Sequence, residues 1–295
     1  MSIPVFINAN SKTGKENADA AFAALEEAGL GIGPKHLTQS AEEAEKLLRE
    51  CVQEKEPLVI VAGGDGALSM AANILAGSET AMAALPMGTG NTFARSIEMP
   101  LELTEAAAAI ASGKIIQVDV GRVNGRVFLN SVTLGISGEI VKNLDGETKA
   151  RLGLLSWPAR ILPILWGHHS LHLKISANGK SFHLHTHQLI ISNGRYLAGP
   201  IEAAPDASLQ DSCLRVFALG KDWKSLLKST FLWIIRRHDS WKETHYFSAK
   251  KLRVESRKES IEADVDGELC ESTPLDLEVQ EGVLRVLTSK EFESE

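Results

Sequence analysis

The stretch VIVAGGDGALSM, residues 59–70, joins an apolar run to a helix-like segment through three glycines and one aspartate. A short apolar run that ends in glycine is typical of a buried strand, and the apolar spacing after Gly66 is helical. Glycines at such a join let backbone N–H groups approach an anion, and the N-terminus of the helix adds partial positive charge. The stretch therefore predicts an α/β unit whose strand-to-helix turn binds a phosphate group.

Asp65 is the single charged side chain of this turn. A carboxylate repels phosphate unless a cation lies between them, which points to a nucleotide bound together with Mg²⁺. A structural alternative stays open, in which the turn is tight for reasons of packing and Asp65 caps a helix.

Two further polar turns follow predicted strands. The turn LPMGTGN, residues 85–91, contains Thr89 and Asn91, which can donate hydrogen bonds to phosphate or ribose oxygens. The turn NANSKTGK, residues 8–15, resembles a Walker A loop but lacks its leading glycine and its final serine or threonine, which disfavours an ordinary P-loop ATPase. The dinucleotide fingerprint fails too, because Ser69 stands where its third glycine belongs, which lowers the rank of a dehydrogenase.

The order of the predicted elements indicates two domains. In the first third of the chain, strand-like runs alternate with helix-like segments, as in a mainly parallel sheet covered by helices. Later segments are strands joined by hairpin turns, at Asn124-Gly125 and at Asn178-Gly179. We therefore expect a nucleotide-binding α/β domain over residues 1–120 and an antiparallel β-sandwich domain over residues 121–295, with the last residues able to pack back on the first domain.

Composition narrows the class of protein. With 295 residues and a formal net charge of -7, the chain lacks the broad basic field that nucleic-acid binding needs. The three cysteines, Cys51, Cys213 and Cys270, are far apart, which is typical of reduced thiols in the cytosol. The first residues lack the apolar core of a signal peptide, and the apolar segment 152–166 is too short to span a bilayer. We expect a cytoplasmic protein that has no transmembrane helix and no nucleic-acid partner.

Taken together, GGDGALSMAANIL, LPMGTGNTFAR and NANSKTGK resemble the diacylglycerol kinase catalytic family, which includes sphingosine, ceramide and bacterial lipid kinases and is related to NAD kinases. The segment 192–216 resembles the central segment of that family, and DVDGEL at residues 264–269 resembles its late Asp-Gly-Glu motif. The resemblance covers nearly the whole chain. It implies that ATP phosphorylates a hydroxyl group of a lipid-like alcohol, which is held by the second domain.

The resemblance also implies roles for particular residues. Asp65 would position Mg²⁺-ATP, and Glu268 would accept the proton of the acceptor hydroxyl. A secondary Mg²⁺ site would use Asp211 and the backbone carbonyl of Cys213. The residues that the resemblance and the glycine turns assign to the nucleotide are Asn8, Ser11, Thr38, Gly63, Gly64, Asp65, Gly66, Ala67, Leu68, Ser69, Met70, Gly88, Thr89 and Asn91.

Several positions differ from the family pattern. The family usually has threonine at Ala67, an Asn-Glu pair at Ser69 and Met70, and an acidic residue at Thr92. Two other functions therefore stay open beside the lipid kinase. One is an NAD kinase-like phosphotransferase, and the other is a nucleotide-binding or lipid-binding relative that has lost catalysis.

Two remaining patterns are interpreted as structural. The segment 223–241 combines aromatic and basic residues and predicts a helix packed on the second domain, with transient contact to a membrane surface as the alternative. His183, His185 and His187 alternate along a predicted strand, and we expect them on its solvent side rather than on a metal. A homodimer is also left open.

Overall fold

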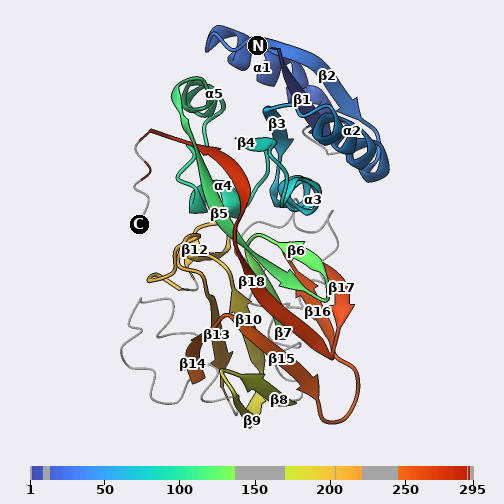
Figure 1. The fold of residues 1–295 in the computed structure, drawn as a ribbon, viewed down its shortest axis with the longest axis vertical. Coiled ribbons are helices and arrows are strands. Elements are labelled where there is room, and N and C mark those ends of the chain that lie inside the picture. The colour runs from blue at the N-terminus through green and yellow to red at the C-terminus, as the bar shows by residue number, and fades with distance from the viewer. Residues whose placement is uncertain are drawn as a thin grey trace, which may run out of the picture. The chain divides into compact units, whose positions relative to one another are not determined.

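The computed structural model describes residues 2–8, 14–136, 170–202, 204–220, 245–290 and 292. The apolar segment 152–166 and the predicted helix 223–241 lie outside these ranges, and so does Ser11. The chain forms two compact units (Figure 1). Unit 1 comprises Met1–Asn130, Asn193–Ser212 and Val279–Glu295, and unit 2 comprises Ser131–Ser192 and Cys213–Glu278.

Unit 1 begins with alternating strands and helices. These are β1 (Ile3–Asn8), α1 (Gly14–Glu27), β2 (Ile32–Thr38), α2 (Ala41–Gln53), β3 (Leu58–Gly63), α3 (Asp65–Leu75), β4 (Ala81–Pro86), α4 (Thr92–Ser96) and α5 (Leu103–Ser112). The strands β5 (Lys114–Val123) and β6 (Arg126–Phe128) follow, and the short strands β11 (Tyr196–Ala198) and β12 (Ile201–Glu202) come from the second segment of the unit. The alternation predicted for the first third of the chain is thus confirmed.

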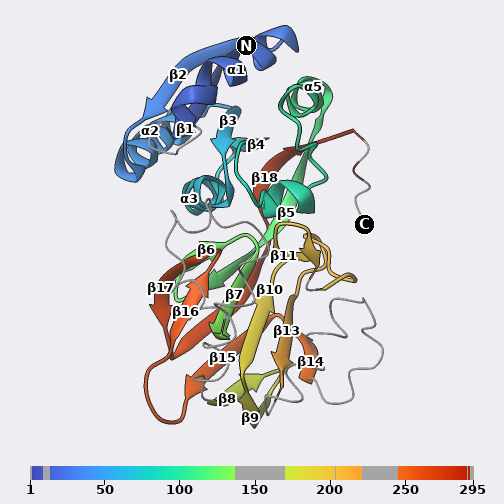
Figure 2. The same cartoon turned by 180° about the vertical axis from the view of Figure 1, so that it is seen from behind.

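The sheet of unit 1 is mainly parallel. Its order is β2-β1-β3-β4-β18, and β1, β2, β3 and β4 pair in parallel. The strand β18 (Leu275–Thr288) adds to β4 in parallel at Val286 and Leu287, so the chain returns to this sheet near its end. Because connections between parallel strands are right-handed, the reversal of order at β1 places α1 and α2 on opposite faces. The helices α2 and α3 accordingly pack together, as do α1 and α5 (Figures 1 and 2).

Local signals in the sequence explain where these elements start. Ser40 caps α2, its Oγ accepting a hydrogen bond of 3.2 Å from the amide of Glu43. The Glu43 carboxylate accepts in turn from the amide of Gln39, which closes a variant of the capping box. The strands β3 and β4 are buried almost throughout, as expected for a sheet covered on both faces.

Unit 2 is built from antiparallel strands. One of its sheets has the order β14-β13-β10-β7-β16-β17, and another set of strands, β15, β8 and β9, pairs with the first residues of β18. The strands are β7 (Ser131–Gly135), β8 (Leu171–Ala177), β9 (Lys180–Thr186), β10 (Gln188–Ser192), β13 (Leu214–Leu219), β14 (His245–Ala249), β15 (Lys251–Ser256), β16 (Glu262–Val265) and β17 (Glu268–Ser272). The predicted fold class, a mainly parallel α/β domain followed by an antiparallel β domain, is confirmed.

The two predicted Asn-Gly hairpin turns are also found. Asn124 and Gly125 close β5 onto β6, and Asn178 and Gly179 close β8 onto β9, all four with positive φ. The stretch RVFLNSVTLG, residues 126–135, forms two strands. It divides at Asn130 into β6 and β7, because the chain passes there from unit 1 into unit 2.

The histidines of β9 follow the prediction only in part. His183 and His185 are exposed, whereas His187 lies just past the end of the strand and is buried. The amide of His187 donates to the carbonyl of Gly220, which holds this residue in the interior of unit 2. Within the described ranges, no group of three or more histidine, cysteine, aspartate or glutamate side chains is arranged to hold a metal ion.

Candidate functional site

The carboxyl ends of the parallel strands bring the predicted nucleotide residues of unit 1 to one edge of the sheet. Asn8 at the end of β1 is in register with Thr38 at the end of β2, and Gly63 at the end of β3 is in register with Pro86 of β4. The strand order reverses at β1, so a topological switch point lies between β1 and β3. Ligands of open α/β sheets bind at such points, outside the carboxyl ends of the strands.

The two glycine turns at this edge pack directly against each other. A Cβ atom added at Gly88 would lie 2.5 Å from the Cα of Gly64, and one added at Gly64 would lie 3.2 Å from the Cα of Gly88. Side chains are therefore excluded at both positions by contact between two backbones. This finding adds a structural reason for the glycines to the phosphate-binding reason that the sequence suggested.

Asp65 uses both of its carboxylate oxygens to hold the second turn. Its Oδ1 accepts a hydrogen bond of 3.0 Å from the amide of Phe93, and its Oδ2 accepts one of 3.1 Å from the hydroxyl of Thr92. A Cβ atom at Gly90 would come within 3.0 Å of Oδ2, so this turn leaves room for the carboxylate. Asp65 is the first residue of α3, but its carboxylate caps the neighbouring helix α4. The alternative that Asp65 serves as a helix cap therefore holds for α4 rather than for its own helix.

Thr92 connects Asp65 to the segment that returns from later in the chain. Its hydroxyl donates to Asp65 and accepts a hydrogen bond of 2.9 Å from the amide of Gly199, and its side chain is buried. The sequence identified Thr92 only as a departure from the family pattern and did not identify Gly199. Gly199 has a φ of 55°, a conformation that favours glycine. This backbone angle cannot be read from a sequence, so Gly199 could not have been identified in advance.

Asn91 and Arg95 fix the shape of the second turn. The Asn91 side chain accepts from the amide of Gly88 and donates to its carbonyl, both at 2.9 Å. Arg95 donates from Nε to the carbonyl of Gly90 at 3.2 Å. Asn91 is buried, whereas Thr89 is exposed and has no hydrogen-bond partner among the described residues, so Thr89 is the side chain of this turn that is free to meet a ligand.

The N-terminus of α3 offers backbone donors at the same edge. The amides of Ala67 and Leu68 donate to the carbonyl of Gly64, and the amides of Asp65 and Gly66 precede the first hydrogen bonds of the helix. Such amides and the positive end of the helix dipole attract phosphate.

The remaining predicted positions along α3 lie at different depths. Ala67 and Met70 are partly exposed, whereas Leu68 and Ser69 are buried toward the core, which leaves Leu68 and Ser69 only backbone atoms to offer to a ligand. Asn73, one turn further on, joins α3 to β6: its Oδ1 accepts from the amide of Val127 and its Nδ2 donates to the carbonyls of Ser69 and Val127.

Glu268 follows a hairpin turn of unit 2. Asp266 and Gly267 form the two-residue connection between β16 and β17, with φ values of 51° and 93°. The turn is held by two aspartates: Asp264 accepts from the amide of Gly267 at 2.7 Å, and Asp266 accepts from the amide of Ser131 at 3.0 Å. The hairpin thus presents Glu268 as an exposed residue on a rigid turn.

The predicted secondary metal position consists of Asp211 and Cys213. The Asp211 carboxylate accepts from the amide of Ser208 at 3.1 Å within unit 1, while Cys213 begins the second segment of unit 2. Nearby in unit 1, Asp119 accepts from the amides of Ser212 and Gly282, both at 2.8 Å, which ties three segments of this unit together.

Comparison with known proteins extends the likeness over nearly the whole chain. A family model described as “Diacylglycerol kinase catalytic domain” matches residues 2–123, and one described as “YegS C-terminal NAD kinase beta sandwich-like domain” matches residues 130–288. A Pseudomonas aeruginosa protein named “Probable lipid kinase YegS-like” is 30% identical over 281 residues, covering 93% of this chain and 90% of its own.

Two other matches agree with these. The protein named “Diacylglycerol kinase” of Bacillus subtilis is 26% identical over 237 residues, covering 79% of this chain and 78% of its own. A crystal structure of a diacylglycerol kinase from Bacillus anthracis superposes with a TM-score of 0.79 at 25% identity, covering 98% of this chain and 97% of that one. None of the helices in the described part of the chain has the length and apolar character that a membrane span requires.

Proposed function

Because this chain belongs to the diacylglycerol kinase catalytic domain family, in its bacterial YegS-like lipid kinase branch, we propose that it transfers the γ-phosphoryl group of ATP to a hydroxyl of a diacylglycerol-like lipid alcohol. The observation that carries the proposal is the contact between the two glycine turns at the carboxyl edge of the sheet, the first of which follows β3 beside the switch point. Between them they supply the free amides of α3 and the carboxylate of Asp65 at one edge.

The residues of unit 1 suit the phosphates of a nucleotide. The amides of Asp65 and Gly66 offer donors at a helix N-terminus, and the exposed hydroxyl of Thr89 offers another from the second turn. Asn8 and Thr38, which are in register at the ends of β1 and β2, lie along the same edge and would contact the rest of the nucleotide. The buried Asn91 holds the turn in shape rather than meeting the ligand.

Asp65 is the carboxylate that would hold Mg²⁺. A carboxylate offers about four lone-pair sites, and Asp65 uses two of them on Phe93 and Thr92, so it keeps the capacity to bind a cation. When bound, Mg²⁺ would neutralise charge on the phosphates during transfer. In unit 2, Glu268 would accept the proton of the acceptor hydroxyl, on a turn that Asp264 and Asp266 keep rigid.

The experiment that tests the proposal supplies the purified chain with γ-labelled ATP, Mg²⁺ and one acceptor at a time. The acceptors are diacylglycerol, monoacylglycerol, sphingosine, ceramide and NAD. We expect label in a lipid. Label in NAD alone would establish the NAD kinase-like alternative and overturn the lipid kinase, and tight ATP binding with no transfer to any acceptor would establish a relative that has lost catalysis.

Two variants test the assigned roles. Asp65→Ala and Glu268→Ala should each abolish transfer while the far-ultraviolet circular dichroism of the protein stays native. Matched controls are Asp19→Ala in α1 and Glu259→Ala in unit 2, which remove exposed carboxylates and should leave transfer unchanged. Transfer at the wild-type rate in both Asp65→Ala and Glu268→Ala would show that the assignment of these residues is wrong.

A further inference from the structure

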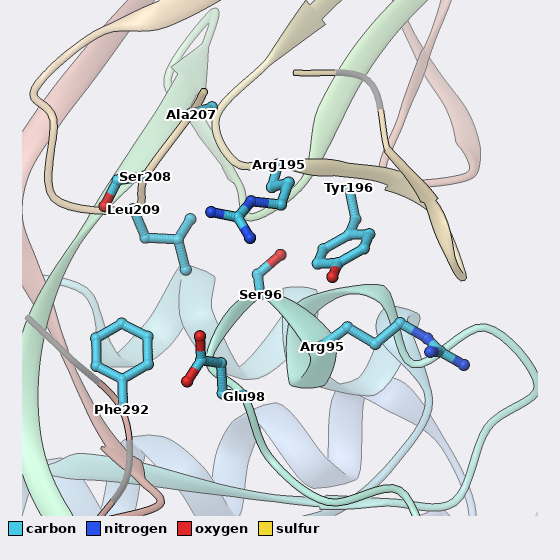
Figure 3. Close-up of a pocket in the computed structure, with 9 residues that line it drawn as sticks. All are labelled: Arg95, Ser96, Glu98, Arg195, Tyr196, Ala207, Ser208, Leu209 and Phe292. Atoms are coloured by element: carbon cyan, nitrogen blue, oxygen red, sulfur yellow. The ribbon is translucent and has the colours of Figure 1, made fainter. Parts of the chain in front are cut away.

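A pocket of about 260 Å³ opens in unit 1 beside α4 (Figure 3). Ser96 of α4 lies on its lower side, and Arg195, which directly precedes β11, and Tyr196, which begins β11, lie on its upper side. Leu209 and Phe292 form an apolar wall, and Glu98 lies beside them. All of these residues belong to unit 1, so the pocket lies within that unit.

Two side chains of the pocket, Arg195 and Tyr196, are donors that lack a partner among the described residues. The guanidinium of Arg195 points into the space above Ser96 in Figure 3, and it forms no hydrogen bond or ion pair with any residue in the described ranges. The Tyr196 hydroxyl likewise has no hydrogen-bond partner among those residues. A guanidinium carries five N–H donors in a planar fork that matches the oxygens of a phosphate. This end of the pocket is therefore suited to an anion.

The opposite end limits what the rest of the ligand can be. The Glu98 carboxylate would repel a second anionic group but accepts hydrogen bonds from a hydroxyl or an ammonium group. The volume is below the roughly 300 Å³ at which pockets for drug-sized ligands begin, which favours a ligand smaller than a nucleotide. We propose that this pocket binds a small phosphomonoester, either as a free molecule that also carries a hydroxyl or ammonium group or as the head group of phosphatidic acid.

The walls of this pocket are tied to the nucleotide edge. The Ser96 hydroxyl donates to the carbonyl of Thr92 at 3.2 Å, and β11 leads into Gly199, whose amide donates to the Thr92 hydroxyl. Thr92 in turn donates to Asp65. A ligand that orders α4 and β11 thus acts on the Asp65 carboxylate through Thr92. Because coupling between two sites is reciprocal, nucleotide and phosphomonoester should change each other's affinity by the same factor.

The proposal rests on unit 1 alone and stands whether or not the protein phosphorylates lipids. Its test is a calorimetric titration of the intact protein with glycerol 3-phosphate, repeated with the variants Arg195→Gln, Glu98→Gln and, as a control, Arg257→Gln. Arg195, Glu98 and Arg257 are exposed, and thermal unfolding would check that each variant is folded. Loss of the guanidinium should weaken binding roughly tenfold or more, as for one charge-assisted hydrogen bond.

The other two variants predict the direction in which the affinity for the ester changes. Glu98→Gln should tighten binding of the phosphate dianion because it removes a like charge, and Arg257→Gln should leave it unchanged because Arg257 lies in unit 2. Equal affinity in the wild type and Arg195→Gln overturns the proposal, and no detectable binding rules out the free ester as the ligand. The proposal is also overturned if ATP displaces glycerol 3-phosphate completely and Arg195→Gln does not change its affinity, because the ester then binds at the glycine turns.

A second arm identifies the source of the phosphate. Sedimentation with phosphatidylcholine vesicles, with and without phosphatidic acid, measures binding to a head group. Binding that needs phosphatidic acid and Arg195 assigns the pocket to a lipid head group, and binding of glycerol 3-phosphate that needs Arg195 without vesicle binding assigns it to a free ester. If the wild type and Arg195→Gln bind vesicles equally, the pocket does not bind a head group. If the calorimetric titration also detects no binding of glycerol 3-phosphate, the proposal is overturned.

Discussion

Replacing Thr92 with valine tests the hydrogen bonds that organise the candidate site. Valine has the shape of threonine without its hydroxyl, so the substitution removes the donor to Asp65 at 3.1 Å and the acceptor for the Gly199 amide at 2.9 Å. Thr92 is 4% exposed, so water has little access to replace either bond. The loss of stability in Thr92→Val therefore measures how much the hydrogen bonds of Thr92 to Asp65 and Gly199 contribute.

The expected cost follows from the two bonds. A hydrogen bond to a charged group contributes about 1.5–3 kcal/mol, and a buried N–H that loses its acceptor costs about 1–3 kcal/mol. Because one hydroxyl makes both bonds, the two costs are not additive, and we expect Thr92→Val to lower the free energy of unfolding by about 2–4 kcal/mol. The Gly199 amide should also exchange its hydrogen with solvent faster than in the wild type.

Urea unfolding followed by circular dichroism measures the stability, and hydrogen exchange measured by NMR reports on the Gly199 amide. The matched control is Thr89→Val, the same chemical change at an exposed position, which should alter stability by less than about 0.5 kcal/mol. If Thr92→Val were as stable as that control and Gly199 exchanged as in the wild type, the connection from α4 to the returning segment would have no energetic importance.

Three further substitutions or treatments have definite expected outcomes. Gly88→Ala places a methyl group 2.5 Å from the backbone of Gly64, so we expect a loss of about 1–3 kcal/mol by overpacking and weaker ATP binding by calorimetry; unchanged values would mean that the turns separate easily. Asn73→Ala removes two hydrogen bonds between α3 and β6 and one within α3. It should lower the free energy of unfolding by about 2 kcal/mol, measured in urea, and a loss smaller than about 0.5 kcal/mol would contradict this. Burial raises the pKa of the Cys51 thiol to about 11, while an unfolded cysteine titrates near about 8.5. The contribution of this thiol to stability is therefore present below the unfolded pKa and is lost as pH rises toward the folded one. In that interval iodoacetamide should label the exposed Cys270 much faster than Cys51 by mass spectrometry, and equal rates would contradict the assignment.

Features that depend on a few neighbouring residues could be predicted from the sequence. The glycine turn around Asp65 and the hairpin turns at Asn124-Gly125 and Asn178-Gly179 are specified by local backbone geometry, and each occurs where it was expected. The same holds for the change from alternating strands and helices to antiparallel strands, because it follows from the hydrophobic period of each segment.

Features that depend on distant contacts could not be predicted. The amide of Gly199 reaches Thr92 across 107 positions, and that of Gly282 reaches Asp119 across 163. Nothing in the residues themselves indicates these partners, because a threonine hydroxyl or an aspartate is equally at home on a surface. The same limit explains why Asp65 was predicted to act toward a metal but not to cap α4, because the cap depends on how closely two separate turns approach.

The central claim is that the glycine turns of unit 1 serve the transfer of a phosphoryl group to a lipid. The most direct measurement incubates the purified protein with γ-labelled ATP, Mg²⁺ and diacylglycerol in detergent micelles, extracts the lipid, and counts the label in the organic phase. The account predicts labelled phospholipid with the wild type and none with folded Asp65→Ala. Absence of label from every lipid acceptor, or equal labelling by Asp65→Ala, would contradict it.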